Sequence, residues 1–445
     1  MQIAILALGS RGDVQPFIAL GLALRRAGHA VRLVGLADYA ELAAGYSLPY
    51  TTVVGAAAEL MDRELVVAAL DAAGSSLPLG FARRFLAQIA PLVAQLCAEC
   101  QRACSDADAL VVSALGLYPG LFIAEQLGLP IAVAHFHPHG PSGALPDVSF
   151  APPPPWLPMP MGRLYNRATH QLAAHGLWQL LRGPLNRARA DALGLRPLSA
   201  PALWARVRAF DPPTLYAYSA AVAPPPQDWP ARRVATGYWT LPAPAGWAPP
   251  APLAHFLAAG PPPVYIGFGS VLAGRDPHAI TALLVEALAR AGVRGLIYRG
   301  AWGDLAGAEL PGHVLAIDAT PHDWLFSRVA AVVTHGGAGT TAAALRAGAP
   351  VVSVPFYGDQ RFWAGRVAAL GAGPPPIPRR ELEPGRLAAA IRLAVADQAM
   401  RTRAAALAAT LAAEDGAALA AELLATAFAT GQSGQRAPRP TAGAL

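Results

Sequence analysis

Short apolar runs alternate with helical periodicities along the first third of the chain. The runs are continuous rather than alternating, as in parallel strands that are buried on both faces. Pro16 in a first turn and the apolar spacing from Phe17 to Leu24 predict an amphipathic helix, which we expect to end at Gly28. Four of the runs are predicted to be strands: residues 2–8, 30–34, 109–112 and 131–134.

The same alternation begins again after Pro263. Apolar runs at residues 264–268, 295–299, 314–317 and 331–334 predict a second set of parallel strands. We therefore predict an α/β chain of two doubly wound, Rossmann-like domains. Such domains bind ligands at the carboxyl ends of their strands, so we expect the two domains to face each other across a cleft formed by those ends.

A proline-dense stretch at residues 224–252 separates the two halves and is the predicted interdomain linker. The assignment that follows is an N-terminal domain at residues 1–240, a C-terminal domain at 241–430 and a disordered tail at 431–445. The last helices of the second domain are free to pack back on the first.

The high apolar content raises the question of a membrane span. Of the 445 residues 54% are hydrophobic, and the mean hydropathy is +0.36. The longest apolar candidate, residues 109–124, is interrupted by Ser113, Gly116 and Pro119 and is shorter than the roughly 20 residues that a bilayer requires. The N-terminus lacks the basic region of a secretory signal. We therefore predict a cytoplasmic protein.

Arginine alone carries the positive charge. The formal net charge is +6 and the chain contains no lysine, which excludes a Walker A lysine, a Schiff-base lysine and the conserved lysine of protein kinases. The arginines are scattered, which does not favour nucleic-acid binding. The charge indicates a solvated surface or a weak peripheral attraction to the anionic inner face of a membrane.

Three cysteines, Cys97, Cys100 and Cys104, have a spacing that could hold a metal. They lie in a helical pattern in which all three fall on one face, and no fourth ligand is near in sequence. We therefore predict that they are buried as small apolar side chains, and we predict no metal site.

A glycine-rich turn carries the strongest chemical signal. A β-branched run stops at His335, and Gly336, Gly337 and Gly339 lead into a segment of good helix formers. The free N–H groups of a helix start, at the carboxyl end of a strand, bind phosphate. His335 and the hydroxyl of Thr340 can donate to the same anion. The sequence therefore predicts a phosphate-binding turn.

Two other interpretations of this turn remain open. Gly337, Gly339 and Ala342 fit a G-x-G-x-x-A dinucleotide fingerprint with Asp359 as its acid, which would indicate a nucleotide-linked oxidoreductase. Asp359 follows a loop instead of ending a strand, so we expect it to be a helix N-cap or a ligand contact. The turn could also be a plain connection without a ligand.

Four motifs resemble those of the nucleotide-sugar glycosyltransferases of GT-B fold. They are GSRGDVQPF at residues 9–17, GPPPVYIGFGS at 260–270, PHDWLF at 321–326 and HGGAGTTAAALRAGAPVVSVPFYGDQRFWAGRV at 335–367. The resemblance is strongest to the sterol 3-β-glucosyltransferase-like group, which is similar to the vancomycin-type antibiotic glycosyltransferases. It runs through nearly the whole chain.

This resemblance implies an inverting transfer of a hexose, with UDP-glucose as the expected donor and without a cofactor or a bound metal. The C-terminal domain would bind the donor and the N-terminal domain the acceptor. His322 and Thr320 depart from the plant-type pattern, so the choice between UDP and dTDP stays open. The residues implied at the donor site are Ser10, Arg11, Gly269, Ser270, His322, His335, Gly337, Gly339, Thr340, Asp359 and Gln360.

Asp13 falls on the position from which this group deprotonates its acceptor, and His335 would stabilise the leaving diphosphate. An aspartate at a helix start is also an ordinary N-cap, and capping would lower its pKa. His135, His137 and His139, which follow a predicted strand, are the alternative bases, although each could be a plain loop histidine.

We expect the acceptor to be a small, flat or elongated apolar alcohol such as a sterol, a hopanoid or a lipid-like aglycone. His135, Phe136, Trp156 and Met159 are the candidate contacts, because aromatic and soft side chains suit an apolar ligand. The alternative is a polyketide, flavonoid or glycopeptide acceptor with a UDP- or dTDP-sugar. A catalytically silent nucleotide-sugar or lipid-binding protein is a third interpretation.

Overall fold

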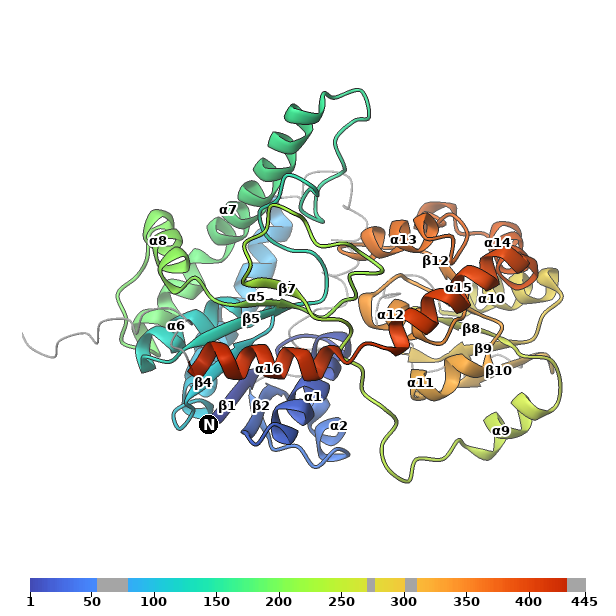
Figure 1. Cartoon of the computed structure of the whole chain (residues 1–445), viewed down its shortest axis with the longest axis horizontal. Coiled ribbons are helices and arrows are strands. Elements are labelled where there is room, and N and C mark those ends of the chain that lie inside the picture. Colours follow the sequence, from blue (N-terminus) through green and yellow to red (C-terminus); the bar gives the residue numbers. More distant parts are fainter. Residues whose placement is uncertain (54–78, 270–276, 301–309, 430–445) are drawn as a thin grey trace, which may run out of the picture.

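A computed structural model describes residues 1–53, 79–269, 277–300 and 310–429. The predicted tail at 431–445 lies outside the described residues. Figure 1 shows two bodies side by side, an N-terminal one in blue to green and a C-terminal one in yellow to red. Each body contains one parallel sheet with helices packed on it, which confirms the predicted α/β class.

Seven parallel strands form the N-terminal sheet in the order β3-β2-β1-β4-β5-β6-β7. Ile3 and Ile5 of β1 pack into one layer of helices, while Ala4 and Leu6 pack into the other, which explains the continuous apolar run. The strands are β1 Gln2–Leu6, β2 Ala30–Leu36, β3 Tyr50–Val53, β4 Ala109–Val112, β5 Ile131–His135, β6 Thr214–Tyr216 and β7 Arg233–Ala235.

Helices α5 to α8 cover one face of this sheet, and α1 lies on the other. The three cysteines are buried on α5 or next to it, as predicted, and burial raises the pKa of Cys97 and Cys104 to about 12. The helices are α1 Arg11–Arg26, η1 Ala37–Tyr39, α2 Ala40–Ala44, α5 Leu79–Ala103, α6 Leu117–Leu127, α7 Met159–Asp191 and α8 Ala200–Phe210.

The C-terminal sheet has five parallel strands in the order β10-β9-β8-β11-β12. The strands are β8 Val264–Gly267, β9 Gly295–Tyr298, β10 Val314–Ile317, β11 Ala331–Thr334 and β12 Val351–Ser353. The helices are α9 Ala251–Ala258, α10 Pro277–Ala291, α11 His322–Leu325, η3 Phe326–Arg328, α12 Ala338–Arg346, α13 Gln360–Ala369, η4 Arg379–Glu381, α14 Pro384–Ala396, α15 Gln398–Ala412 and α16 Gly416–Ala429.

Helix α16 leaves the C-terminal body and returns to the N-terminal one, where it packs on α1 (Figure 1). Its apolar residues Ala420, Leu424 and Phe428 join the same core as Phe17 and Leu20. The chain therefore crosses between the two bodies twice.

The predicted linker at residues 224–252 is too broad. Strand β7 lies inside it and pairs with β6, and Trp239 and Leu241 belong to the N-terminal core. Strand β7 has only three residues and lies in a proline-rich stretch. It is too short to show a hydrophobic periodicity, so the sequence did not predict it.

Direct contacts join the two bodies. The ring centroids of Tyr218 and Trp363 are 5.6 Å apart. Arg366 Nε donates to the Val222 carbonyl at 2.8 Å, and Ser219 donates from its hydroxyl to Glu414, which lies between α15 and α16. These contacts set the relative position of the two sheets.

The segment Gln398–Ala429 is long and apolar enough to cross a membrane by length and composition alone. In the structure it is divided into α15, which packs on α12, and α16, which packs on α1. A third of the apolar window is buried by this packing.

Candidate active site

Loops at the carboxyl ends of both sheets bring the predicted site residues together. Asp13, near the start of α1, is close enough to Asp359, which follows β12, for the charge of Asp359 to raise the Asp13 pKa. Arg11 is likewise close enough to His322 for its positive charge to lower the His322 pKa. Helices α1 and α12 also contact each other. The acceptor-side and donor-side candidates therefore share one region between the bodies.

Asp13 is the third residue of α1 and not its N-cap. The helix begins at Arg11 with Ser10 as N-cap, so the N-cap interpretation of Asp13 is wrong. Asp13 Oδ2 accepts hydrogen bonds from the backbone N–H and the hydroxyl of Ser10, both at 2.8 Å. This S-x-x-D pairing holds one carboxylate oxygen and leaves Oδ1 to accept a proton.

Gly9 lets the Asp13 carboxylate lie against the backbone. Its φ is +135°, and a Cβ at this position would lie 2.5 Å from Asp13 Oδ2. Any side chain at position 9 would therefore be strained and would displace the carboxylate. Gly9 is a positioning residue for Asp13.

Burial raises the pKa of Asp13, the Asp359 charge raises it further, and the two Ser10 hydrogen bonds oppose these effects. The expectation that a helix start would lower this pKa is therefore wrong, because burial outweighs the hydrogen bonds. A carboxylate with a raised pKa is a stronger general base.

Aromatic rings pack together one helical turn beyond Asp13. Phe17 contacts Phe136 and Trp239 edge to face, with ring centroids 5.6 and 5.7 Å away. Phe136, a predicted acceptor contact, therefore packs against the α1 residue one helical turn beyond Asp13. The sequence did not predict that Trp239 packs here, because the proline-rich segment around it has no hydrophobic periodicity.

On the donor side, the glycine turn leads directly into α12. Gly337 is the N-cap and makes no side-chain capping bond, so the first N–H groups of the helix remain for a ligand. A Cβ at Gly337 would lie 2.5 Å from His335 Nε2, whereas a Cβ at Gly339 would meet no described atom within 4 Å. The turn thus supports the His335 ring and leaves open space beside the helix start.

The His335 ring closes one side of this turn. Gly269, after β8, lies against it, since a Cβ there would be 3.3 Å from His335 Cε1. Burial lowers the pKa of His335 to about 4, so the ring is neutral at pH 7. Its Nδ1 is buried and makes no hydrogen bond of ordinary geometry with the described residues, although the Gly267 carbonyl is near enough to act on its pKa.

His322 begins α11 and stacks on Phe326, with ring centroids 4.4 Å apart. Burial, Arg11 and His335 lower its pKa to about 4. A flat neutral ring in this position suits a nucleotide base or ribose. Ser270 lies outside the described residues.

Asp359 and Gln360 start α13 with different surroundings. Asp359 is the N-cap residue, yet its side chain makes no capping bond and accepts from Trp363 Nε1 at 3.1 Å. Burial raises the pKa of Asp359 to about 6. Gln360 is buried, and its side-chain oxygen accepts from the backbone N–H groups of Phe356 and Tyr357, so its amide nitrogen is the group left for a sugar hydroxyl.

The three candidate histidines after β5 form a cluster. The ring centroids of His135 and His139 are 4.6 Å apart, and those of His137 and His139 are 5.7 Å apart. Burial lowers the pKa of His137 and His139 to about 4, and it also lowers that of His135 well below its usual range. His139 Nδ1 lies 4.0 Å from Asp147. These rings are neutral at pH 7 and remain alternative bases.

Trp156 and Met159 are more than two-thirds exposed, at 78% and 71% of their area. Trp156 lies just before α7 and Met159 is its first residue, and the start of this helix stands out from the N-terminal body (Figure 1). Their role as acceptor contacts stays a prediction.

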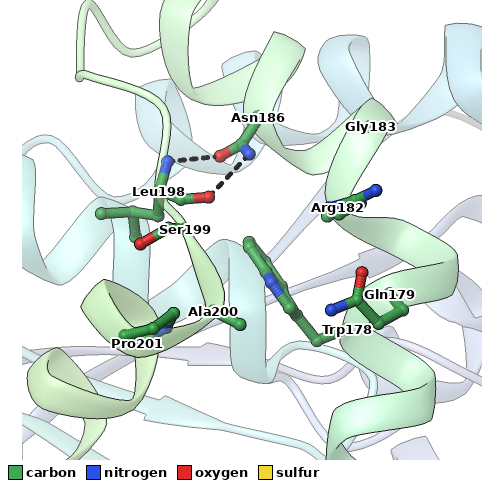
Figure 2. Close-up of a pocket in the computed structure, with 9 residues that line it drawn as sticks. All are labelled: Trp178, Gln179, Arg182, Gly183, Asn186, Leu198, Ser199, Ala200 and Pro201. Carbon is green, nitrogen blue, oxygen red and sulfur yellow. Dashed lines mark hydrogen bonds between the residues drawn. The ribbon is translucent and has the colours of Figure 1, made fainter.

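A surface pocket of about 530 Å³ lies between α7 and residues 198–201 (Figure 2). The Asn186 side chain holds its rim through two hydrogen bonds with the Leu198 backbone, at 2.8 and 2.9 Å. None of the predicted site residues lines this pocket. We therefore place the site at the carboxyl ends of the sheets, where the candidate residues meet.

Two family models match the two halves of the chain. Residues 3–145 match the N-terminal domain of glycosyltransferase family 28, and residues 302–425 match the C-terminal domain of erythromycin biosynthesis protein CIII-like proteins. These matches and the two parallel-sheet domains agree with the resemblance to glycosyltransferases of GT-B fold. The resemblance inferred from the motifs is confirmed, and the oxidoreductase interpretation is not supported.

Within this class the chain is similar to sterol 3-beta-glucosyltransferases. It is 35% identical to that of Emericella nidulans over 436 residues, which is 95% of this chain and 30% of that protein. It is also 35% identical to sterol 3-beta-glucosyltransferase UGT80A2 of Arabidopsis thaliana over 425 residues, which is 94% of this chain and 64% of that protein. The chain thus spans less than two thirds of the length of either relative.

The fold is shared with solved glycosyltransferases. The crystal structure of glycosyltransferase VinC in complex with DTDP superposes with a TM-score of 0.63 at 20% identity. The match covers 96% of this chain and 99% of that one. At this identity the match shows the fold alone.

Proposed function

We propose that this chain transfers glucose from UDP-glucose to the hydroxyl of a sterol or a similar flat apolar alcohol, with inversion at the anomeric carbon. The observation that carries the proposal is the position of Asp13, a carboxylate of raised pKa that faces Asp359 and the donor-side body. The similarity to sterol 3-beta-glucosyltransferases over 95% of the chain supports the acceptor class.

In the proposed reaction Asp13 Oδ1 accepts the proton of the acceptor hydroxyl as its oxygen attacks the anomeric carbon. A glycosidic C–O bond forms, and the bond from that carbon to the diphosphate breaks, so that UDP leaves with the bonding electrons. Attack from the side opposite the leaving group inverts the configuration. A general base of this kind contributes roughly 10² to 10⁴ in rate.

The charge that grows on the leaving diphosphate is stabilised by donors that are already in place. The free N–H groups at the start of α12 and a ring nitrogen of neutral His335 supply these donors. We propose that this arrangement binds the diphosphate without a resident metal ion. Asp359 accepts from sugar hydroxyls, and the Gln360 amide donates to them.

UDP is expected to raise the melting temperature of the protein by on the order of a few °C, because a ligand that binds only the folded state stabilises it. NAD should give no such shift. Transfer activity is expected to survive excess EDTA. Thermal shift and product formation measured by mass spectrometry check both expectations. A chelator-sensitive enzyme that Mg²⁺ or Mn²⁺ restores would contradict the metal-independent donor site.

The acid limb of the pH–rate profile is expected to report the ionisation of Asp13 together with that of Asp359, whose pKa burial raises to about 6. The base must be deprotonated, so kcat/KM falls as pH drops through its raised pKa. Asp359→Asn removes a negative charge that raises this pKa, so the midpoint of the limb should move to lower pH, whatever the absolute rate. Profiles of both proteins test this. An unmoved midpoint would show that Asp359 does not influence the base.

Competition between acceptors under one donor tests the acceptor class. A sterol, a flavonoid and a free sugar are supplied together, and the products are separated by mass. Preferred transfer to the sterol supports the proposal, whereas preferred transfer to the hydrophilic sugar overturns it.

A further inference from the structure

The segment that leads into α7 and the first half of that helix, residues 150–177, stand out from the N-terminal body (Figure 1). We refer to them as the α7 projection. Among the described residues, eleven large apolar side chains are exposed, and six of these belong to the projection. The six are Trp156, Met159, Met161, Leu164, Leu172 and Leu177. Such clustering marks an interaction surface.

The first half of α7 differs from an ordinary surface helix, which buries its apolar side; the second half buries Trp178 and Leu185 in the core as usual. Met161, Leu164 and Leu172 recur at helical spacing and point to solvent. The buried side is polar: Asn166 Nδ2 donates to the Gly143 carbonyl at 2.9 Å, and Thr169 Oγ1 accepts from the Asp147 N–H at 3.0 Å. Hydrogen bonds thus hold the helix to the body while its apolar stripe stays outside.

The charge of this region has one sign. Residues 150–177 contain no aspartate or glutamate and contain two arginines, Arg163 and Arg167. Arg163 and Arg167 line a shallow hollow of about 260 Å³ together with Met159, Pro160 and Leu164. Arg167 also pairs with Asp228 at 3.0 Å, which leaves further guanidinium donors for a ligand. Arginine next to apolar surface is the chemistry that binds a phosphate attached to hydrocarbon.

We propose that the α7 projection docks on an anionic lipid membrane, with the apolar stripe at the boundary of headgroups and acyl chains and a lipid phosphate in the hollow of Arg163 and Arg167. The docking proposal rests on the proposed function in one respect: docking would bring the proposed active site to a sterol dissolved in the membrane. A second copy of the chain is a poor occupant, because residues 150–177 contain no carboxylate that could pair with Arg163 of the other copy, and the nearby Asp228 already pairs with Arg167.

Sedimentation of the full chain with lipid vesicles tests the proposal without donor or acceptor. We expect binding to vesicles of phosphatidylcholine with phosphatidylglycerol, weaker binding to phosphatidylcholine alone, and weakening of the former by salt. The triple variant Met161→Ser, Leu164→Ser, Leu172→Ser should bind on the order of tenfold less to the anionic vesicles. Arg163→Glu should also lose on the order of tenfold, because it reverses a charge in the hollow.

Matched variants on other exposed surfaces are the controls. Leu393→Ser with Leu419→Ser, and separately Arg401→Glu, should bind vesicles like the unmodified chain. Far-ultraviolet circular dichroism and melting temperature show that each variant is folded. Equal binding by the projection variants and the controls, or no binding of the unmodified chain to anionic vesicles, overturns the proposal. A dimer of the unmodified chain that the triple variant loses would assign the surface to a second copy and also overturn it.

The two proposals can fail separately. Vesicle binding needs no chemistry, and transfer to a detergent-solubilised acceptor needs no membrane. Loss of vesicle binding with retained transfer therefore removes the docking surface alone, and the reverse result removes the proposed function alone.

Discussion

Asp13→Asn is expected to lower kcat by roughly 10² to 10⁴ while UDP binding stays near that of the unmodified protein. Asparagine keeps an oxygen that can accept from Ser10 and has nearly the same size, so α1 should begin as before. The substitution removes the proton acceptor and little else. Steady-state kinetics with a sterol acceptor, together with calorimetric titration of UDP, measure the two quantities.

Glu41→Gln, on the exposed side of α2, is the matched control and should leave kcat unchanged. A folded Asp13→Asn protein with near-full activity would reject Asp13 as the base. The next candidates would then be His135, His137 and His139, which burial keeps neutral and therefore able to accept a proton at pH 7.

His335→Ala is expected to lower kcat by roughly 10² to 10³, as the loss of one donor to a developing anion does in other enzymes. The reason is that His335 is neutral, half-buried and next to the N-terminus of α12, where the leaving diphosphate would lie. The donor KM should change less than kcat, because the charge is largest in the transition state.

His335→Gln tests whether donation itself matters, since its amide can restore part of the rate. The control is His255→Ala on the exposed surface of α9, which should have no effect. An intact kcat with a raised donor KM in His335→Ala would show that the residue contributes to binding and not to the chemical step.

Much of the architecture could be predicted because it depends on local periodicity. Strands β4, β10 and β11 have the predicted bounds. Most of the other predicted strands end within two residues of their predicted ends. Continuous apolar runs mark strands that are buried on both faces, and this property does not depend on distant partners. The glycine turn before α12 could also be predicted from local sequence. Gly336 adopts a positive φ, which glycine accepts without strain.

The proposed catalytic arrangement could not be predicted without the tertiary structure. The sequence identified Asp13 and Asp359 separately, but their proximity arises from two bodies that are joined by Tyr218, Trp363 and the return of α16. The direction of the Asp13 pKa shift also followed from burial, which the local sequence does not contain. The capping pair with Ser10 could have been found from its S-x-x-D spacing.

The sequence by itself therefore determined the class of fold, the donor-side turn and the family, because each is encoded in short stretches of periodicity or motif. Only the tertiary structure decided that Gln360 is held by its own loop, that β7 belongs to the first sheet, and that the first half of α7 leaves Met161, Leu164 and Leu172 exposed. These features depend on which distant surfaces meet, and that outcome is the sum of many weak contacts that no single stretch of the chain contains.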